Sequence, residues 1–147
     1  FYCRKFKTGS IKLPNENVLK MMKNFVQRVI DNKNKTLRFI KAQHKAGKKI
    51  FLYGASTKGN TVLQYYGLNE KIIPYAAERS PFKWDKYTIG SGIKIISEKE
   101  AKKLKPDFFF VTPWGFIKEF INREKKWLNE GGKFIVPFPN MKVIGKK

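Results

Sequence analysis

Two hydrophobic periods divide the chain. Over residues 15–46 apolar side chains recur at steps of three and four, which predicts helix, and a polar run at residues 31–35 interrupts the stripe. After Gly47 short apolar runs alternate with amphipathic segments. The expected strands cover residues 48–53, 72–77, 93–96, 108–112 and 133–138, and the expected helices cover residues 57–66, 97–105 and 116–129. Strands and helices in alternation predict an α/β fold, with a Rossmann-like, open and mostly parallel sheet and helices on both faces.

The first helix is long for a small domain. Unbroken over residues 15–46, it would extend about 48 Å at roughly 1.5 Å per residue. We therefore expect a long or broken N-terminal helix, either interrupted near residues 32–35 or projecting toward another surface. In the projecting case, part of its apolar stripe should stay exposed and mark an interface. The residues from which that patch is expected are Met21, Met22, Phe25 and Val29.

Finer expectations concern single residues inside the later elements. Pro74 lies within the second expected strand and indicates an edge strand or a bulge, because proline cannot donate to a ladder. Ser97 and Glu100 have the spacing of a capping box and predict the start of a helix. In the last expected helix, the residues expected to face the core are Phe116, Phe120, Trp127 and Leu128.

The chain has 147 residues but one cysteine and one histidine, which excludes several kinds of site. A zinc site of cysteines and histidines needs about four ligands, and Cys3 and His44 supply two. A lone cysteine permits no disulfide within the chain, so a cytoplasmic location is the default expectation. No apolar run approaches the roughly 20 residues of a membrane span, and no membrane partner is expected.

The net charge of +21 raises the question of nucleic acid. Residues 1–50 carry 14 basic and 2 acidic groups, whereas residues 51–100 carry 7 and 5. Five of the 32 basic residues are arginines, and the bidentate arginine fork is what readers of phosphates and bases favour. A lysine-rich surface is more typical of solvation, so nucleic-acid binding is the least favoured alternative.

The segment from Gly54 to Thr61 follows the first expected strand, where α/β domains bind phosphates through backbone N–H groups. It departs from a P-loop because Asn60 stands where lysine is required, which argues against Mg-dependent phosphoryl transfer. It departs from the dinucleotide fingerprint because Ser56 replaces the second glycine, at which the pyrophosphate approaches the backbone. It still suits an anionic ligand, although a turn with purely structural glycines fits the same residues. The candidate contacts are Gly54, Ala55, Ser56, Thr57, Lys58, Gly59 and Asn60.

Further candidates lie at the ends of other expected strands. Glu78 follows Gly54 by 24 residues, close to the spacing at which an acid holds ribose hydroxyls, and a surface ion pair is the alternative. Arg79 follows it directly. Trp114 comes after the fourth expected strand, where it either stacks on a sugar or base or closes the sheet. The carboxyl ends of parallel strands lie on one rim, so these residues are expected near the glycine turn.

Three motifs, in order, resemble the C-terminal domain of S-adenosylmethionine-dependent C-methyltransferases. That family includes enzymes that methylate a carbon of deoxysugar nucleotides. The motifs are Leu52–Thr61, Glu78–Lys83 and Thr112–Gly115, and the resemblance covers residues 48–144. Relatives usually carry glycine after the Lys83 region, where this chain has Trp84 and Asp85, which leaves the shape of the following loop and the exact substrate open.

The resemblance implies a parent enzyme of three parts. A zinc-binding module and a domain that binds S-adenosylmethionine would precede this segment and would be its partners in the same chain. Residues 1–14 would be the tail of the preceding methyltransferase domain, residues 15–47 a helical connector, and residues 48–147 a Rossmann-like substrate domain. Neither a catalytic residue nor a metal nor a cofactor is expected in this segment, which alone should not transfer methyl groups.

The function implied by the resemblance is recognition of a nucleotide-sugar substrate. Lys83 joins Glu78 and Arg79 as a candidate substrate contact through the second motif. A freestanding α/β nucleotide-binding module and a basic nucleic-acid-binding protein are the alternatives. Binding that weakens steeply with salt would favour the nucleic-acid alternative, because it releases counterions from the phosphate backbone.

Overall fold

The computed structural model describes residues 15–146. The chain divides into two units, of which the first ends at Asp31 and the second begins at Asn32. One α-helix, α1 (Glu16–Lys45), runs from the first unit into the second. The expected long N-terminal helix is therefore present, and it does not break in the polar run. The expected domain tail at residues 1–14 lies outside the described residues.

In the first unit, α1 exposes apolar side chains. Met21 and Phe25 are 70% and 59% exposed, Met22 is also exposed, and Val29 is half-buried. The expected exposed patch is thus found on this part of the helix. Among the described residues, no helix combines the length and the apolar composition that crossing a membrane requires.

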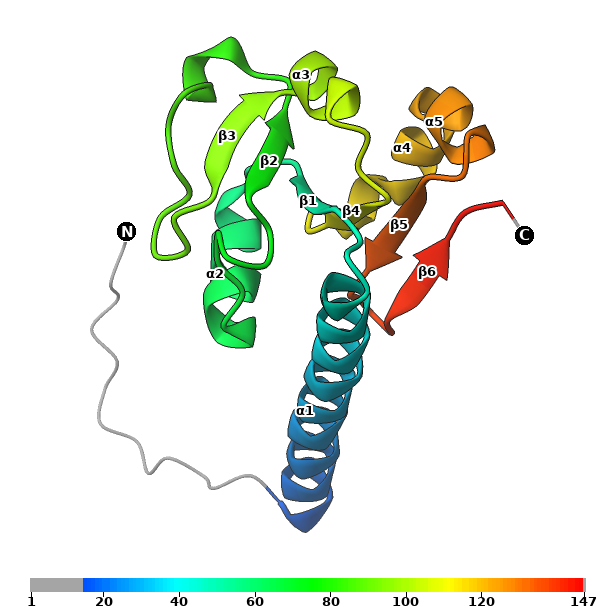
Figure 1. Ribbon diagram of the computed structural model, residues 1–147. Helices are drawn as coiled ribbons and strands as arrows, with labels where there is room; N and C mark the ends of the chain where they lie inside the picture. Colours follow the sequence, from blue (N-terminus) through cyan, green and yellow to red (C-terminus); the bar gives the residue numbers. More distant parts are fainter. Residues whose placement is uncertain (1–14, 147) are drawn as a thin grey trace. The chain divides into compact units, whose positions relative to one another are not determined.

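Six strands form one sheet in the order β3-β2-β1-β4-β5-β6 (Figure 1). Their bounds are β1 (Ile50–Tyr53), β2 (Tyr75–Glu78), β3 (Lys94–Ser97), β4 (Phe108–Val111), β5 (Lys133–Val136) and β6 (Lys142–Ile144). Strands β1 to β5 run parallel, and β6 pairs antiparallel with β5. The strand order reverses between β1 and β4, so the crevice in which open α/β sheets bind ligands lies at the carboxyl ends of these two strands.

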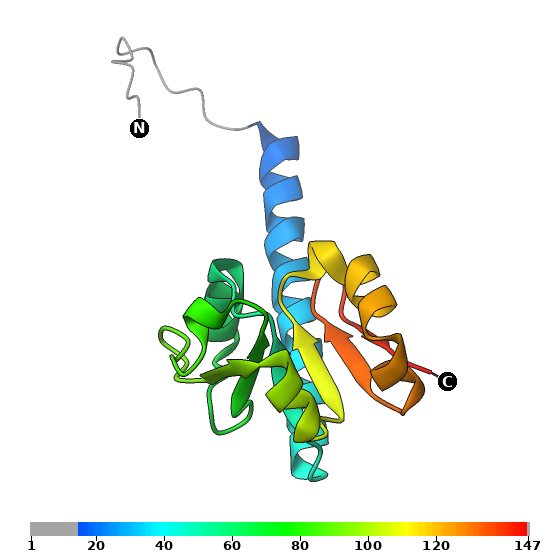
Figure 2. The same cartoon turned by 90° about the horizontal axis from the view of Figure 1, so that it is seen from above.

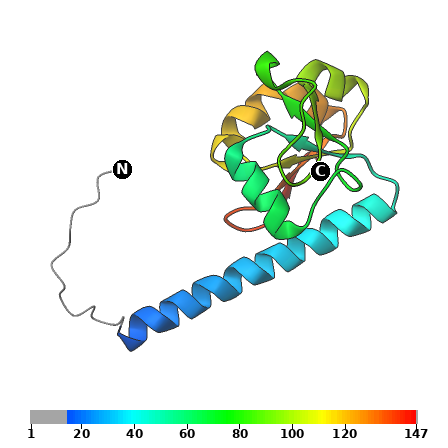
Figure 3. The ribbon, with the colours of Figure 1, turned by 90° about the vertical axis from the view of Figure 1, so that its left-hand side faces the viewer.

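Helices cover both faces of the sheet, as expected. After α1 they are α2 (Thr57–Tyr66), α3 (Glu98–Lys103), α4 (Ile117–Arg123) and α5 (Lys125–Asn129), with short 3₁₀ turns η1 (Pro81–Lys83) and η2 (Trp114–Phe116). One core cluster joins Leu63 of α2 and Ile40 of α1 to the sheet, and the other joins Phe120 of α4 and Trp127 of α5. Figure 2 shows α3, α4 and α5 in front of the strands, and Figure 3 shows α2 beside the cyan part of α1.

The polar run inside α1 has a structural reason. Asn32 is buried, its amide donates to the Pro137 carbonyl, and its Oδ1 accepts the Met141 N–H at 2.8 Å. Thr36, also buried, donates to the Asn32 carbonyl at 2.8 Å. The interruption of the apolar stripe therefore marks a polar tether to the connection between β5 and β6.

Some local expectations are wrong. β2 lies between β1 and β3, so Pro74 marks neither an edge nor a bulge; it precedes the first residue of the strand, where no ladder N–H is needed. The expected helix over residues 116–129 is divided at Glu124 into α4 and α5. Phe116 ends η2 and is 61% exposed, because α4 begins one residue later. The hydrophobic pattern also did not predict β6, a three-residue strand at the sheet edge.

Candidate functional site

The turn after β1 uses the conformational freedom of its first glycine. Gly54 has a φ of +84°, in the region that favours glycine, and its N–H donates to the Ala77 carbonyl at 2.8 Å. A side chain there would also meet Pro113, since a Cβ atom would lie 2.8 Å from the proline Cγ. Gly54 therefore lets β1 end in close contact with the segment that follows β4.

The start of α2 is capped by Ser56. Its Oγ accepts the Gly59 N–H at 3.0 Å. Among the described residues, the N–H groups of Ser56, Thr57 and Lys58 have no acceptor, and the last two residues are exposed. The amino end of α2 thus offers backbone donors, the positive end of the helix dipole and an ammonium group, all of which favour an anion.

The second glycine of this segment serves packing. A Cβ atom on Gly59 would lie 2.5 Å from Oγ1 of Thr112, a buried residue directly after β4. This is the role that the third glycine plays in dinucleotide-binding sheets, where it allows helix and strand to approach. The Asn60 N–H donates to the Ser56 carbonyl at 3.0 Å, so Gly59 and Asn60 both contribute to the helix itself.

Glu78, at the end of β2, is engaged by the protein on both carboxylate oxygens. Its Oε1 accepts the N–H groups of Arg79 at 2.9 Å and Ser80 at 3.0 Å, and its Oε2 accepts the Ala55 N–H at 3.0 Å. Lys83 Nζ lies 3.4 Å from Oε2 and donates to the Ala55 carbonyl at 2.9 Å. Burial alone raises the pKa of Glu78, but the donors of Ser80, Ala55 and Lys83 outweigh it and hold the pKa below its ordinary value. Glu78 and Lys83 therefore fasten the glycine turn to β2.

The loop after β2 is also fastened to this rim. Trp84 Nε1 donates to the Glu78 carbonyl at 2.8 Å. Asp85 has a φ of +59°, in the region that favours glycine but that aspartate adopts more readily than most residues. The chain thus keeps a glycine-like backbone in the stretch where the resembling family usually has glycine.

Two pockets open at the carboxyl ends of β1 and β4. The first, which we call the Arg123 pocket, has a volume of about 250 Å³, and the second, the Lys58 pocket, about 350 Å³. The Arg123 pocket is lined by Tyr53, Gly54, Ser56, Ala77, Glu78, Arg79, Glu98, Pro113, Phe116, Glu119, Phe120 and Arg123. The Lys58 pocket is lined by Ser56, Thr57, Lys58, Thr112, Pro113, Trp114, Gly115 and Phe116. Ser56, Pro113 and Phe116 belong to both pockets, which therefore adjoin.

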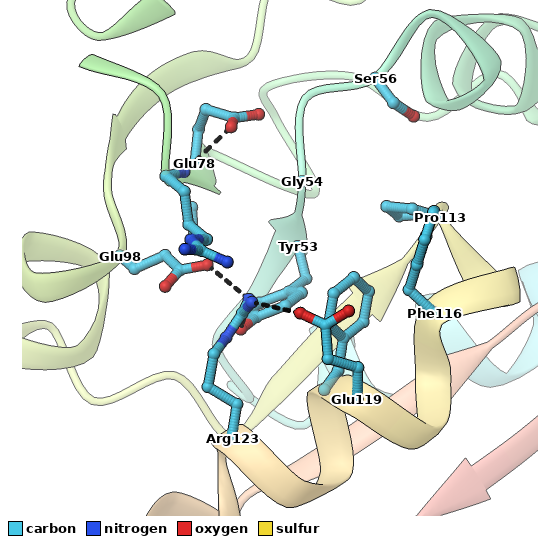
Figure 4. A pocket seen from close by; sticks show the side chains of 12 residues that line it. Tyr53, Gly54, Ser56, Glu78, Glu98, Pro113, Phe116, Glu119 and Arg123 are labelled. Carbon is cyan, nitrogen blue, oxygen red and sulfur yellow. Dashed lines mark hydrogen bonds and ion pairs between the residues drawn. The ribbon is translucent and has the colours of Figure 1, made fainter.

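Arg123 is the centre of a side-chain network in the first pocket (Figure 4). Its Nη2 donates to Tyr53 Oη at 2.6 Å and to Glu98 Oε1 at 2.8 Å, and its Nη1 donates to Glu119 Oε1 at 3.3 Å. The guanidinium carbon lies 5.1 Å from the Phe120 ring centroid and 5.5 Å from that of Tyr53. Contacts on several sides therefore fix the guanidinium in one position.

A buried carboxylate lies behind this network. Glu124 is 2% exposed; its Oε1 accepts the Tyr53 hydroxyl at 2.8 Å, and its Oε2 lies 2.7 Å from Lys102 Nζ. Burial raises the pKa of Tyr53 above its ordinary value, more than the Arg123 hydrogen bond lowers it. Burial alone lowers the pKa of Arg123, but Tyr53 and the carboxylates outweigh it and raise that pKa. The tyrosine therefore stays neutral and the arginine charged near neutral pH.

The structure brings most of the candidate residues to the two pockets. Gly54, Glu78 and Arg79 line the first, Thr57, Lys58 and Trp114 line the second, and Ser56 lines both. Ala55 and Lys83 join this rim through their hydrogen bonds, whereas Gly59 and Asn60 line neither pocket. Trp114 is half-buried and packs on Phe138, with ring centroids 4.8 Å apart, so it also closes the sheet as the alternative held. Whether these residues contact a ligand stays a prediction.

Sequence reasoning missed the residues around Arg123. Glu119 and Arg123 are four residues apart in the helical order that favours an ion pair, a local signal that could have drawn attention to them. Glu98 follows the last residue of β3 and so lies at the same rim as Glu78. Among residues 15–146, no group of three or more histidines, cysteines or acidic residues could hold a metal ion.

Comparison with known proteins identifies the family of the chain. Residues 15–139 match the family model of the C-methyltransferase C-terminal domain. A C-methyltransferase, NovU from Streptomyces niveus, is 38% identical over 98 residues, which are 67% of this chain and 23% of the relative. The matched segment thus spans about a quarter of the relative's length. The match covers both pockets and most of the sheet, and the chain belongs to the C-methyltransferase C-terminal domain family.

Proposed function

We propose that this domain binds the substrate of a C-methyltransferase, a nucleotide-sugar, at the rim formed by the two pockets. The observation that carries the proposal is the Lys58 pocket, where an ammonium group and the positive end of α2 occur together with three N–H groups that have no acceptor in the described part of the chain. A diphosphate is the part of a nucleotide-sugar that these groups are suited to hold. Trp114 in the same pocket offers an aromatic surface beside that position.

The rim does not fit S-adenosylmethionine in the way that dinucleotide-binding sheets hold their cofactors. Ser56 stands at the second glycine position, and Glu78, the acid at the ribose spacing, has both oxygens engaged by the protein. We therefore place methyl transfer outside this domain. In the proposed parent enzyme, S-adenosylmethionine would supply the methyl group from another part of the chain. This domain would contribute the orientation of the substrate, which lowers the entropic cost of reaction.

The exposed face of α1 fits a neighbouring domain of the parent chain. Met21, Met22 and Phe25 are exposed in the first unit, and exposed apolar patches of a few hundred Å² usually mark interfaces. A relative in which the matched segment is 23% of the length has room for S-adenosylmethionine-binding and zinc-binding domains. We propose that a domain of that kind covers this face, with association of two copies of the chain as the competing explanation. Dimerisation that Phe25→Glu abolishes would favour the second.

Calorimetric titration of the chain with UDP-glucose tests the substrate proposal. Lys58→Ala removes a full charge and should weaken binding about tenfold, by the loss of one charge-assisted hydrogen bond. It should leave the melting temperature unchanged, because Lys58 is exposed. Lys71→Ala, at another exposed lysine in the turn before β2, is the matched control and should change neither quantity. Ser56→Leu should block approach to the backbone and abolish binding.

A turn with a purely structural role predicts a different result. Ser56→Leu lowers the melting temperature in either case, because Ser56 caps α2. If the turn is purely structural, Lys58→Ala leaves the affinity for UDP-glucose unchanged, and the proposal fails. Titration with S-adenosylmethionine tests the assignment of the cofactor to another part of the parent chain, and micromolar binding to this chain would contradict it. Titration with an oligonucleotide between about 50 and 200 mM salt tests the nucleic-acid alternative, which requires tight binding with a steep salt dependence.

A further inference from the structure

The Arg123 pocket differs in chemistry from the Lys58 pocket beside it. Glu78, Glu98 and Glu119, three of the eleven acidic residues of the chain, line the Arg123 pocket. Two of its five arginines, Arg79 and Arg123, line it as well. In a chain with a net charge of +21, the overall composition does not account for this gathering of carboxylates. The Lys58 pocket, by contrast, is lined by one charged residue, which is basic.

The three carboxylates of the Arg123 pocket are not equivalent. Glu78 has both oxygens engaged by backbone N–H groups and Lys83. Glu98 and Glu119 each accept from Arg123 through Oε1. Among the described residues, no donor reaches Oε2 of either side chain, so each keeps an oxygen for a donor from outside the protein.

Arg123 holds these two acceptors in place. Its guanidinium bonds both carboxylates at once (Figure 4). The guanidinium is itself held by the Tyr53 hydroxyl and the Phe120 ring. Phe116 and Pro113 supply an apolar wall in the same pocket. Two fixed acceptors opposite an apolar surface match a molecule with hydroxyl donors on its edge and C–H groups on its face. Such preorganisation reduces the entropy lost on binding.

We propose that the Arg123 pocket binds the sugar ring of the nucleotide-sugar, with ring hydroxyls donating to Glu98 and Glu119 and the apolar ring face on Phe116. The inference rests on the proposed function, because the diphosphate in the Lys58 pocket anchors the ligand. A volume of about 250 Å³ is smaller than pockets that hold whole drug-sized ligands, so it admits one ring and not the entire molecule. The residues shared by the two pockets place the sugar on the other side of Pro113 from the diphosphate.

The same hydroxyl chemistry is present in the ribose of the nucleotide, and the test separates the two sources. The affinities of UDP-glucose, UDP and TDP, which lacks the ribose 2′-hydroxyl, are measured for the chain and for Glu98→Gln and Glu119→Gln. Glutamine keeps an oxygen for Arg123 and replaces the other carboxylate oxygen by an NH2 group, which cannot accept from a ring hydroxyl. Glu100→Gln, at an exposed residue of α3 outside both pockets, is the control. Glu119 is 57% exposed, so its replacement tests binding without risk to the fold.

The proposal requires that both substitutions weaken UDP-glucose binding about tenfold and leave UDP and TDP binding unchanged. It is overturned if UDP-glucose binding is unaffected in both variants. It is also overturned if UDP binding falls as much as UDP-glucose binding while TDP binding is unaffected, because the pocket would then hold the ribose. In both results, Lys58-dependent binding of UDP leaves the proposed function standing. If none of the three ligands binds the unaltered chain, both the proposed function and this inference fail.

Discussion

The two pockets on either side of Pro113 are built in opposite ways. The Lys58 pocket depends largely on the backbone, because a serine cap and N–H groups that have no acceptor among residues 15–146 line it at the start of α2. The Arg123 pocket depends on side chains of three elements, with Tyr53 from β1, Glu98 from α3 and Arg123 from α4. A site made by the backbone keeps its geometry when its exposed side chains are changed. A site made by a network loses its geometry when one buried partner is removed.

The largest loss of stability is expected from a change in the side-chain network of the Arg123 pocket. Glu124→Ala should lower the free energy of unfolding by about 3 kcal/mol, because removing one partner of a buried charge network leaves the others unpaired. The buried Glu124 carboxylate binds both the Tyr53 hydroxyl and Lys102. Urea unfolding of the variant measures the change.

Glu119→Ala is the comparison for Glu124→Ala, because Glu119 contacts Arg123 but is largely exposed. Its loss should change the free energy of unfolding by less than about 0.5 kcal/mol. Equal losses in the two variants would show that burial does not distinguish the two carboxylates, and the account of the network would be wrong.

The contrast between the pockets also explains which of them the sequence predicted. The Lys58 pocket is lined by two short continuous segments, residues 56–58 and 112–116, each of which follows an expected strand. Helix α2 has the bounds that its period and its glycines predict. The contact between Tyr53 and Arg123 joins residues 70 positions apart, and that between Glu98 and Arg123 joins residues 25 apart. No local pattern encodes such pairs, because they follow from the strand order and from the helices that cover one face.

Glu78 shows a different limit of sequence reasoning. Its spacing from Gly54 placed it correctly at the end of β2 and beside the turn. The number of donors around a carboxylate is a tertiary property, so the engagement of both oxygens by Ala55, Arg79 and Ser80 was not predictable from spacing. Periodicity predicted the alternation of strands and helices well because β1 and β4 are buried along their whole length and β2, β3 and β5 are buried at their centres. It failed at β6, a short edge strand with two exposed residues.

In the backbone turn that begins α2, the largest loss of stability is expected from a change at Gly59. Gly59→Ala should destabilise the chain by about 2 kcal/mol, since the new Cβ would lie 2.5 Å from Thr112 Oγ1 and helix α2 must shift. Thermal unfolding measures the loss. Gly115→Ala is the control, because a Cβ atom there meets nothing within 4 Å. A Gly59→Ala variant as stable as the control would contradict the close packing of α2 on the end of β4.

Glu78 lines the Arg123 pocket and also binds the backbone turn before α2. Its contribution to the stability of the fold should depend on pH. Glu78→Gln should cost about 1.5 kcal/mol near neutral pH, because a charge-assisted acceptor is lost. The pKa of Glu78 is lower in the folded chain than its ordinary value of 4.5, so the unfolded chain binds the proton more readily. The stabilisation is therefore complete above pH 4.5 and is lost as the pH falls through the lower, folded pKa.

Urea unfolding at several pH values tests this dependence. The difference in stability between the unaltered chain and Glu78→Gln should be constant from about pH 6 to 7 and should shrink below pH 4.5. Using the difference removes the contribution of Asp107, whose pKa is also lowered and which both proteins keep. A difference that grows on acidification would contradict the hydrogen bonding assigned to Glu78.

The smallest effects come from two serine caps, and their comparison separates structure from recognition. Ser56 caps α2 by accepting the Gly59 N–H at 3.0 Å, and Ser97 caps α3 by accepting the Glu100 N–H at 3.1 Å. Replacement of either by alanine should cost about 1 kcal/mol, the usual loss for an N-cap. Ser56 lines both pockets of the candidate site and Ser97 lines neither, so Ser56→Ala alone should also weaken binding of UDP, by a few-fold, through the lost hydroxyl. Thermal unfolding and calorimetry on both variants give the two readouts. Equal stability losses with equal affinities for UDP would assign Ser56 to the helix alone, and recognition at this rim would then depend on the backbone and Lys58.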